Sequence, residues 1–156
     1  RAIRSATKDK ALFIVNDRVD IAILSEADGV HLGQDDIPLV EARKLMPEAV
    51  IGVSTHNLKE AFDAASLGAD YISYGPIFAT KTKNDADTPK GLEGLKKLAP
   101  SINIPIVAIG GITAETATAI IEAGASAIAV ISDILLASDI KSRTSEIISR
   151  IERKGA

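Results

Sequence analysis

Six short runs of apolar, mostly branched residues alternate along the chain with six amphipathic stretches, and this alternation limits the fold more than any other feature. The runs that predict strands are 12–15, 29–32, 50–54, 71–75, 105–109 and 127–131. The stretches that predict helices are 17–26, 38–45, 58–67, 92–98, 114–123 and 140–151. Strands that alternate with helices pair in parallel, so we expect a single α/β domain over residues 1–156.

The number of these units suggests part of a (β/α)8 barrel, or TIM barrel. Such a barrel typically needs about 250 residues, whereas this sequence has 156. Residues 2–10 are interpreted as the end of a helix that leads into the first predicted strand. We therefore expect a TIM barrel without roughly its first two strands and first helix. A doubly wound open sheet is the alternative, although no glycine-rich turn follows the first strand to favour a dinucleotide-binding fold.

Charge and composition narrow the classes of partner. The net charge of −3 provides no basic surface for nucleic acid. The absence of cysteine excludes disulfides and cysteine-ligated metals. No apolar run reaches the roughly 20 residues that a membrane-spanning helix requires, and the polar start is unlike a secretory signal. We expect a cytoplasmic protein that binds small molecules and neither nucleic acid nor membrane. The sequence leaves open whether it forms a homo-oligomer.

Polar residues gather directly after each predicted strand. They are Asn16 and Asp17, the run 31–36, the run 54–56, Gly75 with the long polar loop 76–89, Gly110 and Gly111, and Ser132 and Asp133. Any one of these groups can be explained as a turn or a helix cap. In a barrel, however, the carboxyl ends of all strands meet on one face, where active sites lie. Six polar ends together therefore predict a ligand site.

Two of these polar residues, Asp17 and Asp36, are candidate ligands of Mg²⁺. Carboxylates from adjacent strand ends can share this hard cation, which prefers oxygen ligands and often bridges substrate phosphates. Asp35 competes with Asp36 for this role. The alternative is that both aspartates cap the helices that follow them.

Phosphate binding is predicted at two turns and one loop. Gly110 and Gly111 stand between a strand and a helix, where exposed backbone N–H groups attract phosphate. The turn at Ile131 and Ser132 is a second such place, and barrels commonly hold phosphate after their last two strands. The loop segment 80–83, Thr-Lys-Thr-Lys, offers hydroxyls and cations for an anion, although it can also be a solvated loop.

The remaining polar residues have simpler interpretations. His31 lies within a strand and is predicted to be a core histidine rather than a catalytic one. His56 follows a strand, and both roles are open for it. Arg18 and Asp20 are expected to form a surface ion pair.

Taken together, five segments resemble the thiamine-phosphate synthase family. They are IVNDR at 14–18, GVHLGQDD at 29–36, IGVSTH at 51–56, GPIFATKTK at 75–83 and IGGI at 109–112. The resemblance covers nearly the whole chain in order. It implies a (β/α)8 barrel that joins an aminopyrimidine diphosphate to a thiazole phosphate and releases pyrophosphate, with Mg²⁺ as cofactor.

The resemblance also implies residue roles. Asp17 and Asp36 would hold Mg²⁺ on the diphosphate, which Asn16, Ser54 and Lys83 would contact directly. The thiazole phosphate would be held by Thr80, Thr82, the Gly111 amide and the turn of Ile131 and Ser132. Diphosphate would leave first, and the thiazole nitrogen would then capture the pyrimidine methylene cation, so no side chain is needed as a covalent nucleophile.

One feature of the family has no counterpart here. A further family strand carries a Gln, an Arg and a Lys that contact the pyrimidine diphosphate, and no segment of this chain matches it. Three other functions are weighed: a thiazole tautomerase on the same fold, which would use His56; a non-catalytic fragment that binds phosphate; and a phosphosugar-binding isomerase barrel. The aspartate pair and the lysine loop favour the synthase.

Overall fold

The strands of the computed structural model form one parallel sheet that follows the order of the chain. The structure describes residues 2–80 and 88–152. The sheet order is β1-β2-β3-β4-β5-β6, and each neighbouring pair is parallel. The strands are β1 (Ile14–Asn16), β2 (Gly29–Leu32), β3 (Val50–Thr55), β4 (Tyr71–Tyr74), β5 (Ile106–Ile109) and β6 (Ala127–Ala129). Because no strand is out of sequence order, the doubly wound alternative is wrong.

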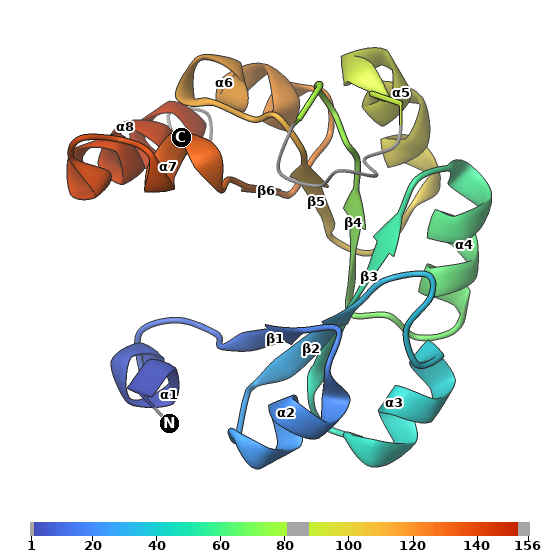
Figure 1. Ribbon diagram of the computed structural model, residues 1–156. Coiled ribbons are helices and arrows are strands. Elements are labelled where there is room, and N and C mark those ends of the chain that lie inside the picture. Colours follow the sequence, from blue (N-terminus) through green and yellow to red (C-terminus); the bar gives the residue numbers. More distant parts are fainter. Residues whose placement is uncertain (1, 81–87, 153–156) are drawn as a thin grey trace.

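Most of the helices cover the outer, convex side of this sheet, which curls into a half-barrel with β1 and β6 at its two ends, whereas α1 lies beyond β1 (Figure 1). The helices are α1 (Ala2–Thr7), α2 (Val19–Leu24), α3 (Leu39–Leu45), α4 (Leu58–Ser66), α5 (Gly91–Leu98), the 3-10 turn η1 (Ala99–Ser101), α6 (Ala114–Glu122), α7 (Ser132–Leu135) and α8 (Ile140–Glu152). The predicted α/β class is confirmed, and the six strands form a TIM-barrel-like half-barrel.

Most predicted element boundaries differ from the observed ones by only a few residues. The predicted helix end at residues 2–10 is α1, which the sequence placed correctly. The sixth strand was predicted to continue to residue 131 but ends at Ala129, because the chain turns there into the short helix α7. A four-residue helix is too short to show the apolar periodicity that sequence analysis detects.

Alternation along the strands separates the core from the concave face. Val30, Leu32, Ile51, Val53 and Ile72 are buried, and they pack under the outer helices. The residues between them point to the concave side, where the sequence is polar or small. The core therefore lies between the sheet and the helices, and the concave face is left for polar side chains.

One arrangement of hydrogen bonds recurs at the starts of β2, β4 and β6. Asp28, Asp70 and Ser126 each directly precede a strand or lie at its start, and each side chain accepts a hydrogen bond from a backbone N–H of the preceding strand region. Gly68 and Gly124 directly follow the C-cap residues of α4 and α6, and their φ values of 90° and 107° are typical of a glycine that ends a helix. Such repeated anchoring matches the periodic βα pattern of the sequence.

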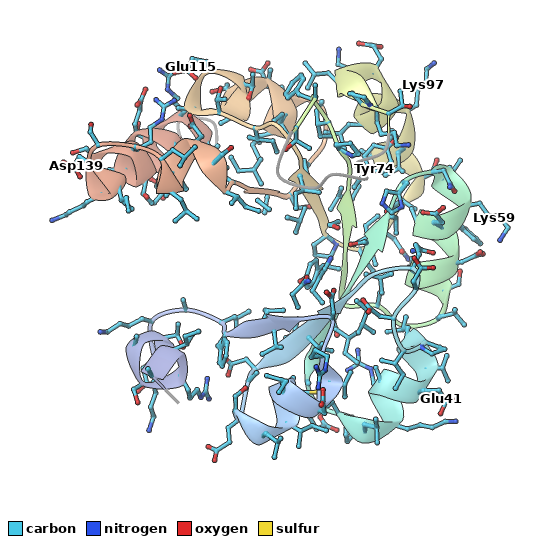
Figure 2. All side chains as sticks on the ribbon, viewed as in Figure 1. Glu41, Lys59, Tyr74, Lys97, Glu115 and Asp139 are labelled. Carbon is cyan, nitrogen blue, oxygen red and sulfur yellow. The ribbon has the colours of Figure 1, made fainter. Side chains whose placement is uncertain are left out.

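Charged side chains lie on the outer helices. Figure 2 shows Glu41, Lys59, Lys97 and Glu115 pointing away from the sheet. The predicted surface pair is confirmed, since Arg18 donates to both carboxylate oxygens of Asp20. Within residues 2–80 and 88–152, none of the helices is both long and apolar enough to cross a bilayer.

Candidate functional site

A cavity of about 510 Å³ lies at the carboxyl ends of the strands. All six strands, or the segments that directly follow them, contribute to its wall. The lining residues are Asp17, Gly33, Gln34, Asp35, Asp36, Ser54, Thr55, His56, Ser73, Gly75, Pro76, Thr80, Ile109, Gly110, Gly111, Ile112, Ala129, Ile131 and Ser132. The predicted convergence of polar strand ends on one site is therefore confirmed.

Asp17 enters the cavity wall through an unusual backbone conformation. It follows β1 directly, its φ is 65°, and its N–H donates to the His31 carbonyl at 2.8 Å. A left-handed conformation is uncommon for residues other than glycine, although aspartate tolerates it better than most. The N-cap residue of α2 is Arg18 rather than Asp17, and the Arg18 side chain makes no capping hydrogen bond.

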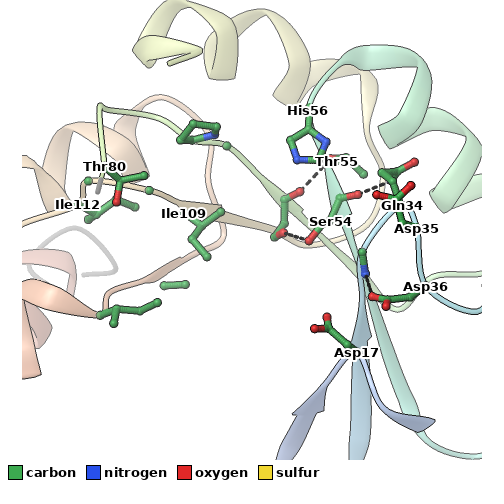
Figure 3. A pocket seen from close by; sticks show the side chains of 18 of the residues that line it. Asp17, Gln34, Asp35, Asp36, Ser54, Thr55, His56, Thr80, Ile109 and Ile112 are labelled. Atoms are coloured by element: carbon green, nitrogen blue, oxygen red, sulfur yellow. Dashed lines mark hydrogen bonds between the residues drawn. The ribbon is translucent and has the colours of Figure 1, made fainter. Parts of the chain in front are cut away.

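Asp36 belongs to a tight turn after β2. Its Oδ2 accepts a hydrogen bond from the Gly33 N–H at 2.6 Å, which closes the turn 33–36. It does not cap α3, whose N-cap residue is Pro38. Gln34 links this turn to β3 by donating to the Ser54 carbonyl. The turn therefore holds Asp36, with Asp35, at the cavity (Figure 3).

The donor set at this side of the cavity suits a hard cation. Asp17, Asp35 and Asp36 supply carboxylate oxygens from two adjacent strand ends (Figure 3). Mg²⁺ is usually held by one or two carboxylates with substrate phosphates and water, rather than by an all-protein cage. Residues 2–80 and 88–152 contain no group of three or more His, Cys, Asp or Glu side chains that could hold a metal ion by themselves.

The end of β3 adds neutral and basic groups. Ser54 and Thr55 line the cavity with His56, whose Nδ1 lies 3.0 Å from Oε2 of Glu60. The same Glu60 oxygen accepts the His56 backbone N–H at 2.8 Å. A carboxylate in this position favours the proton on Nδ1, which makes Nε2 the basic nitrogen of His56.

On the opposite side of the cavity, two glycines let two loops pack backbone to backbone. A Cβ on Gly110 would lie 2.5 Å from Cβ of Pro76, and one on Gly111 would lie 2.6 Å from the Ala79 carbonyl oxygen. Their φ values of 98° and 64° also require glycine. The turn at Gly110 and Gly111 thus packs closely against the segment after β4.

The segment after β4 is anchored at both of its described ends. The Phe78 N–H donates to the Gly110 carbonyl at 3.0 Å, and the Lys90 N–H donates to the Pro76 carbonyl at 2.8 Å. Thr80 is thereby held in the cavity wall. The predicted phosphate-binding residues Thr82 and Lys83, and Lys81 between Thr80 and Thr82, lie outside the described residues.

The turn after β6 is held by a partly buried ion pair behind it. Asp133 accepts from Arg143 through both carboxylate oxygens, at 2.8 and 2.9 Å, and from the Ala114 N–H at 3.0 Å. Ion pairs to Glu115 and Glu146 extend this contact. The pKa of Arg143 is raised by its hydrogen bonds, first to Asp133 and then to Glu146. This network joins α6, α7 and α8 and positions Ile131 and Ser132 at the cavity.

Eight of the predicted site residues lie in the described part of the chain, and all but one of them line the cavity. Asp17, Asp36, Ser54, Thr80, Gly111, Ile131 and Ser132 line the cavity, whereas Asn16, at the exposed end of β1, does not. Sequence analysis missed Ser73, which lines the cavity beside Ser54. The alternation in Tyr-Ile-Ser-Tyr at 71–74 was the available signal, because it places Tyr71 and Ser73 on one face.

Fold and site together define a TIM-barrel-like protein with a polar cavity at the carboxyl ends of its strands. Comparison with known proteins specifies the family. A family model described as thiamine monophosphate synthase matches residues 1–134. The chain belongs to this family.

Two curated relatives are both named thiamine-phosphate synthase. The protein from Chloroflexus aurantiacus is 54% identical over 127 residues, which are 81% of this chain and 59% of the relative. The protein from Moorella thermoacetica is 48% identical over 159 aligned positions, which cover 99% of this chain and 76% of the relative. The chain thus spans between about six-tenths and three-quarters of the length of these relatives.

Solved structures agree on the fold. Thiamine phosphate pyrophosphorylase from Pyrococcus furiosus superimposes with a TM-score of 0.88 at 41% identity, over 96% of this chain and 72% of that protein. A 3-hexulose-6-phosphate synthase superimposes with a TM-score of 0.72 at 20% identity, over 96% of this chain and 78% of that protein. The second match supports only the barrel-like fold.

Proposed function

We propose that the protein joins an aminopyrimidine diphosphate to a thiazole phosphate, forming thiamine phosphate and pyrophosphate. The observation that carries this proposal is the composition of one cavity. Carboxylates line it on the side of β1 and β2, and a glycine turn with hydroxyl groups lines it on the side of β5 and β6. Membership of the thiamine monophosphate synthase family supports the same reaction.

The carboxylate side would take the diphosphate. Asp17 and Asp36 would hold Mg²⁺, which when bound supplies positive charge beside the diphosphate oxygens. Ser54 would donate a hydrogen bond to the diphosphate from the end of β3, and Asn16 and Lys83 are proposed as further contacts. Together these residues would orient the diphosphate and stabilise the charge that develops as its bond to the pyrimidine methylene breaks.

The glycine side would take the thiazole phosphate. The Gly111 N–H, Thr80 and the turn of Ile131 and Ser132 line the same cavity and would donate to the phosphate oxygens. Thr82 is proposed to join them. Holding the thiazole phosphate here would align its ring nitrogen with the methylene carbon, so that the new C–N bond forms after diphosphate departs.

The test follows thiamine phosphate formation from the two substrates, with Mg²⁺ and after its removal by a chelator. We expect product that depends on Mg²⁺ and that is released with an equal amount of pyrophosphate. Binding of both substrates without product would instead support a phosphate-binding protein that is not a synthase. The protein is proposed to act in the cytoplasm on small phosphorylated substrates, and a homo-oligomer is compatible with this role.

One observation favours a second candidate, thiazole tautomerase. His56 lines the cavity, and its contact with Glu60 leaves Nε2 as a base that can move a proton. Incubation with a thiazole carboxylate phosphate distinguishes the two functions. Isomerisation without Mg²⁺ that is lost in His56→Gln would identify a tautomerase, whereas the proposed synthase leaves this compound unchanged.

A further inference from the structure

A chain of polar side chains lies beneath the cavity on the concave face of the sheet. His31, Gly52 and Tyr71 are register partners on the three neighbouring strands β2, β3 and β4. Tyr71 hydroxyl oxygen lies 3.0 Å from Nδ1 of His31, and the two rings stack with centroids 5.4 Å apart. Neither His31 nor Tyr71 is among the residues that line the cavity.

Gly52 makes this contact across an intervening strand possible. A Cβ on Gly52 would lie 2.1 Å from Cζ of Tyr71, so any larger residue would exclude the tyrosine ring from this position. The glycine thus leaves a gap in the middle strand into which the ring fits. Tyr71 and His31 are therefore brought together by a specific feature of the sheet, rather than by general packing.

The next layer toward the cavity contains two serines. Ser54 and Ser73 are also register partners, on β3 and β4, and both line the cavity. Oγ of Ser54 lies 2.9 Å from Nε2 of His31, and Oγ of Ser73 lies 3.3 Å from the same nitrogen. The Ser73 hydroxyl is also 3.4 Å from that of Ser54. His31 consequently connects the hydroxyl of the half-buried Tyr71 with a hydroxyl in the cavity wall.

The position of the imidazole proton of His31 distinguishes two arrangements of these hydrogen-bonded side chains. If Nδ1 carries the proton, the single lone pair of Nε2 faces two serine hydroxyls, and the Tyr71 proton needs another acceptor. If Nε2 carries it, Tyr71 donates to Nδ1, and the Nε2–H is shared between Ser54 and Ser73. The second arrangement gives both the Tyr71 proton and the imidazole proton an acceptor among these side chains. It agrees with the direction of the pKa of Tyr71, which burial raises, so that the phenol keeps its proton.

We propose that Tyr71 is a positioning residue which, through His31, directs the Ser54 hydroxyl proton into the cavity. With Nε2–H of His31 and the hydroxyl of Ser73 donating to it, the Ser54 oxygen has both lone pairs occupied. Its own proton then points to the ligand. An anion can only accept hydrogen bonds. If the Ser54 hydroxyl instead donated to Nε2 of His31, its lone pairs would face the diphosphate and repel it.

The relevance of this arrangement to catalysis rests on the proposed function, but the tautomer of His31 is measurable without it. Nitrogen-15 NMR of the uniformly labelled protein reports which imidazole nitrogen carries the proton. The sequence has two histidines, so a His56→Gln sample assigns the signals. We expect neutral His31 with its proton on Nε2. A proton on Nδ1, or on both nitrogens, would overturn the proposal.

Two matched variants then test the role of Tyr71. Tyr71→Phe keeps the stacked ring and removes only the hydroxyl. Tyr74→Phe removes the other tyrosine hydroxyl of β4, which is near Gly94 of α5 on the opposite face of the sheet. We expect Tyr71→Phe to abolish the single Nε2–H tautomer, whereas Tyr74→Phe preserves it. An unchanged tautomer in Tyr71→Phe would contradict the proposal.

Binding of inorganic pyrophosphate with Mg²⁺, measured by calorimetry, provides the link to function. Tyr71→Phe is expected to weaken this binding roughly tenfold, as loss of one oriented hydrogen bond would. Thiazole phosphate affinity should stay unchanged, and Tyr71→Phe in a Ser54→Ala background should have no further effect. If Tyr71→Phe lowered pyrophosphate affinity equally in the parent protein and in the Ser54→Ala background, the proposal would be refuted. If the parent protein binds no pyrophosphate, the proposed function fails, while the tautomer still decides the arrangement.

Discussion

The two sides of the cavity differ in the groups that line them. On the side of β1 and β2, the wall consists of carboxylates, and Asp17 reaches it through a left-handed backbone conformation. On the side of β5 and β6, the wall contains Gly110 and Gly111, packed against the segment after β4, together with hydroxyl and apolar side chains such as Ser132 and Ile109. The first side suits a cation and the second suits an anion.

Because the two sides of the cavity differ in this way, we expect them to respond to different substitutions. A carboxylate acts through charge, so an isosteric amide removes its function without changing its shape. A glycine turn acts through backbone position, so an added methyl group removes its function without changing any charge.

The largest effect is expected from the carboxylates. Asp17→Asn and Asp36→Asn should each lower kcat/KM for thiamine phosphate formation by about 10²- to 10³-fold, because charge stabilisation at the leaving group is lost. Asp20→Asn, which alters the exposed pair with Arg18, is the matched control and should change kcat/KM less than twofold. Steady-state assays at several Mg²⁺ concentrations measure this. Activity retained in Asp17→Asn would rule out the assigned metal site.

The glycine side is tested by Gly111→Ala with Gly68→Ala as control. Both glycines have positive φ, which alone makes alanine cost about 1–2 kcal/mol in the free energy of unfolding. Only Gly111 has a neighbour in the way, since nothing lies within 4 Å of a Cβ on Gly68. Urea unfolding should therefore show a larger loss for Gly111→Ala, and only this variant should lose affinity for thiazole phosphate. Equal effects would contradict the close-approach argument.

A smaller effect is expected at the turn after β6. Ser132→Ala should weaken thiazole phosphate binding about tenfold, the value of one hydrogen bond to a charged group. Pyrophosphate binding should be unaffected, because Ser132 lies on the glycine side. Ser149→Ala serves as the control, since its hydroxyl donates to the Glu146 carbonyl on exposed α8. Calorimetry with each ligand measures both affinities, and equal weakening of the two would remove the distinction between the sides.

The smallest effect concerns stability in acid. The pKa of Glu115 is lowered from 4.5 to about 2, first by the Thr113 hydroxyl and with a smaller contribution from Arg143. A lowered folded-state pKa stabilises the protein above the unfolded value and loses this contribution as pH falls through the folded value. Glu115→Gln should therefore be less stable than the parent protein at pH 7, and the difference should shrink between about pH 4.5 and 2.

The pKa of Asp28, which directly precedes β2, is also lowered, first by the Phe13 N–H and then by Arg4. Asp28→Asn should show the same sign of change, with the difference lost as pH falls below 3.8. Chemical denaturation across this range measures both variants. A difference in stability that is constant with pH would show that neither carboxylate acts through its charge.

Much of the fold and part of the site were determined by the sequence alone. Alternation of apolar runs and amphipathic stretches set the strands, the helices and the parallel pairing, because these depend on periodicity within a few residues. The same local reasoning put Asp17, Asp36, Ser54 and Gly111 at strand ends. In a parallel sheet all carboxyl ends share one side, so their meeting at one cavity followed.

Tertiary structure alone decided how residues far apart in the chain meet. His31 and Tyr71 are 40 residues apart, and their contact depends on strand register and on the space above Gly52. The partner of the Gly110–Gly111 turn, the short helix α7 and the left-handed conformation of Asp17 likewise depend on how the sheet curls. Local patterns specify which face a side chain occupies, whereas register and curvature determine its neighbours, and these arise only when the strands assemble.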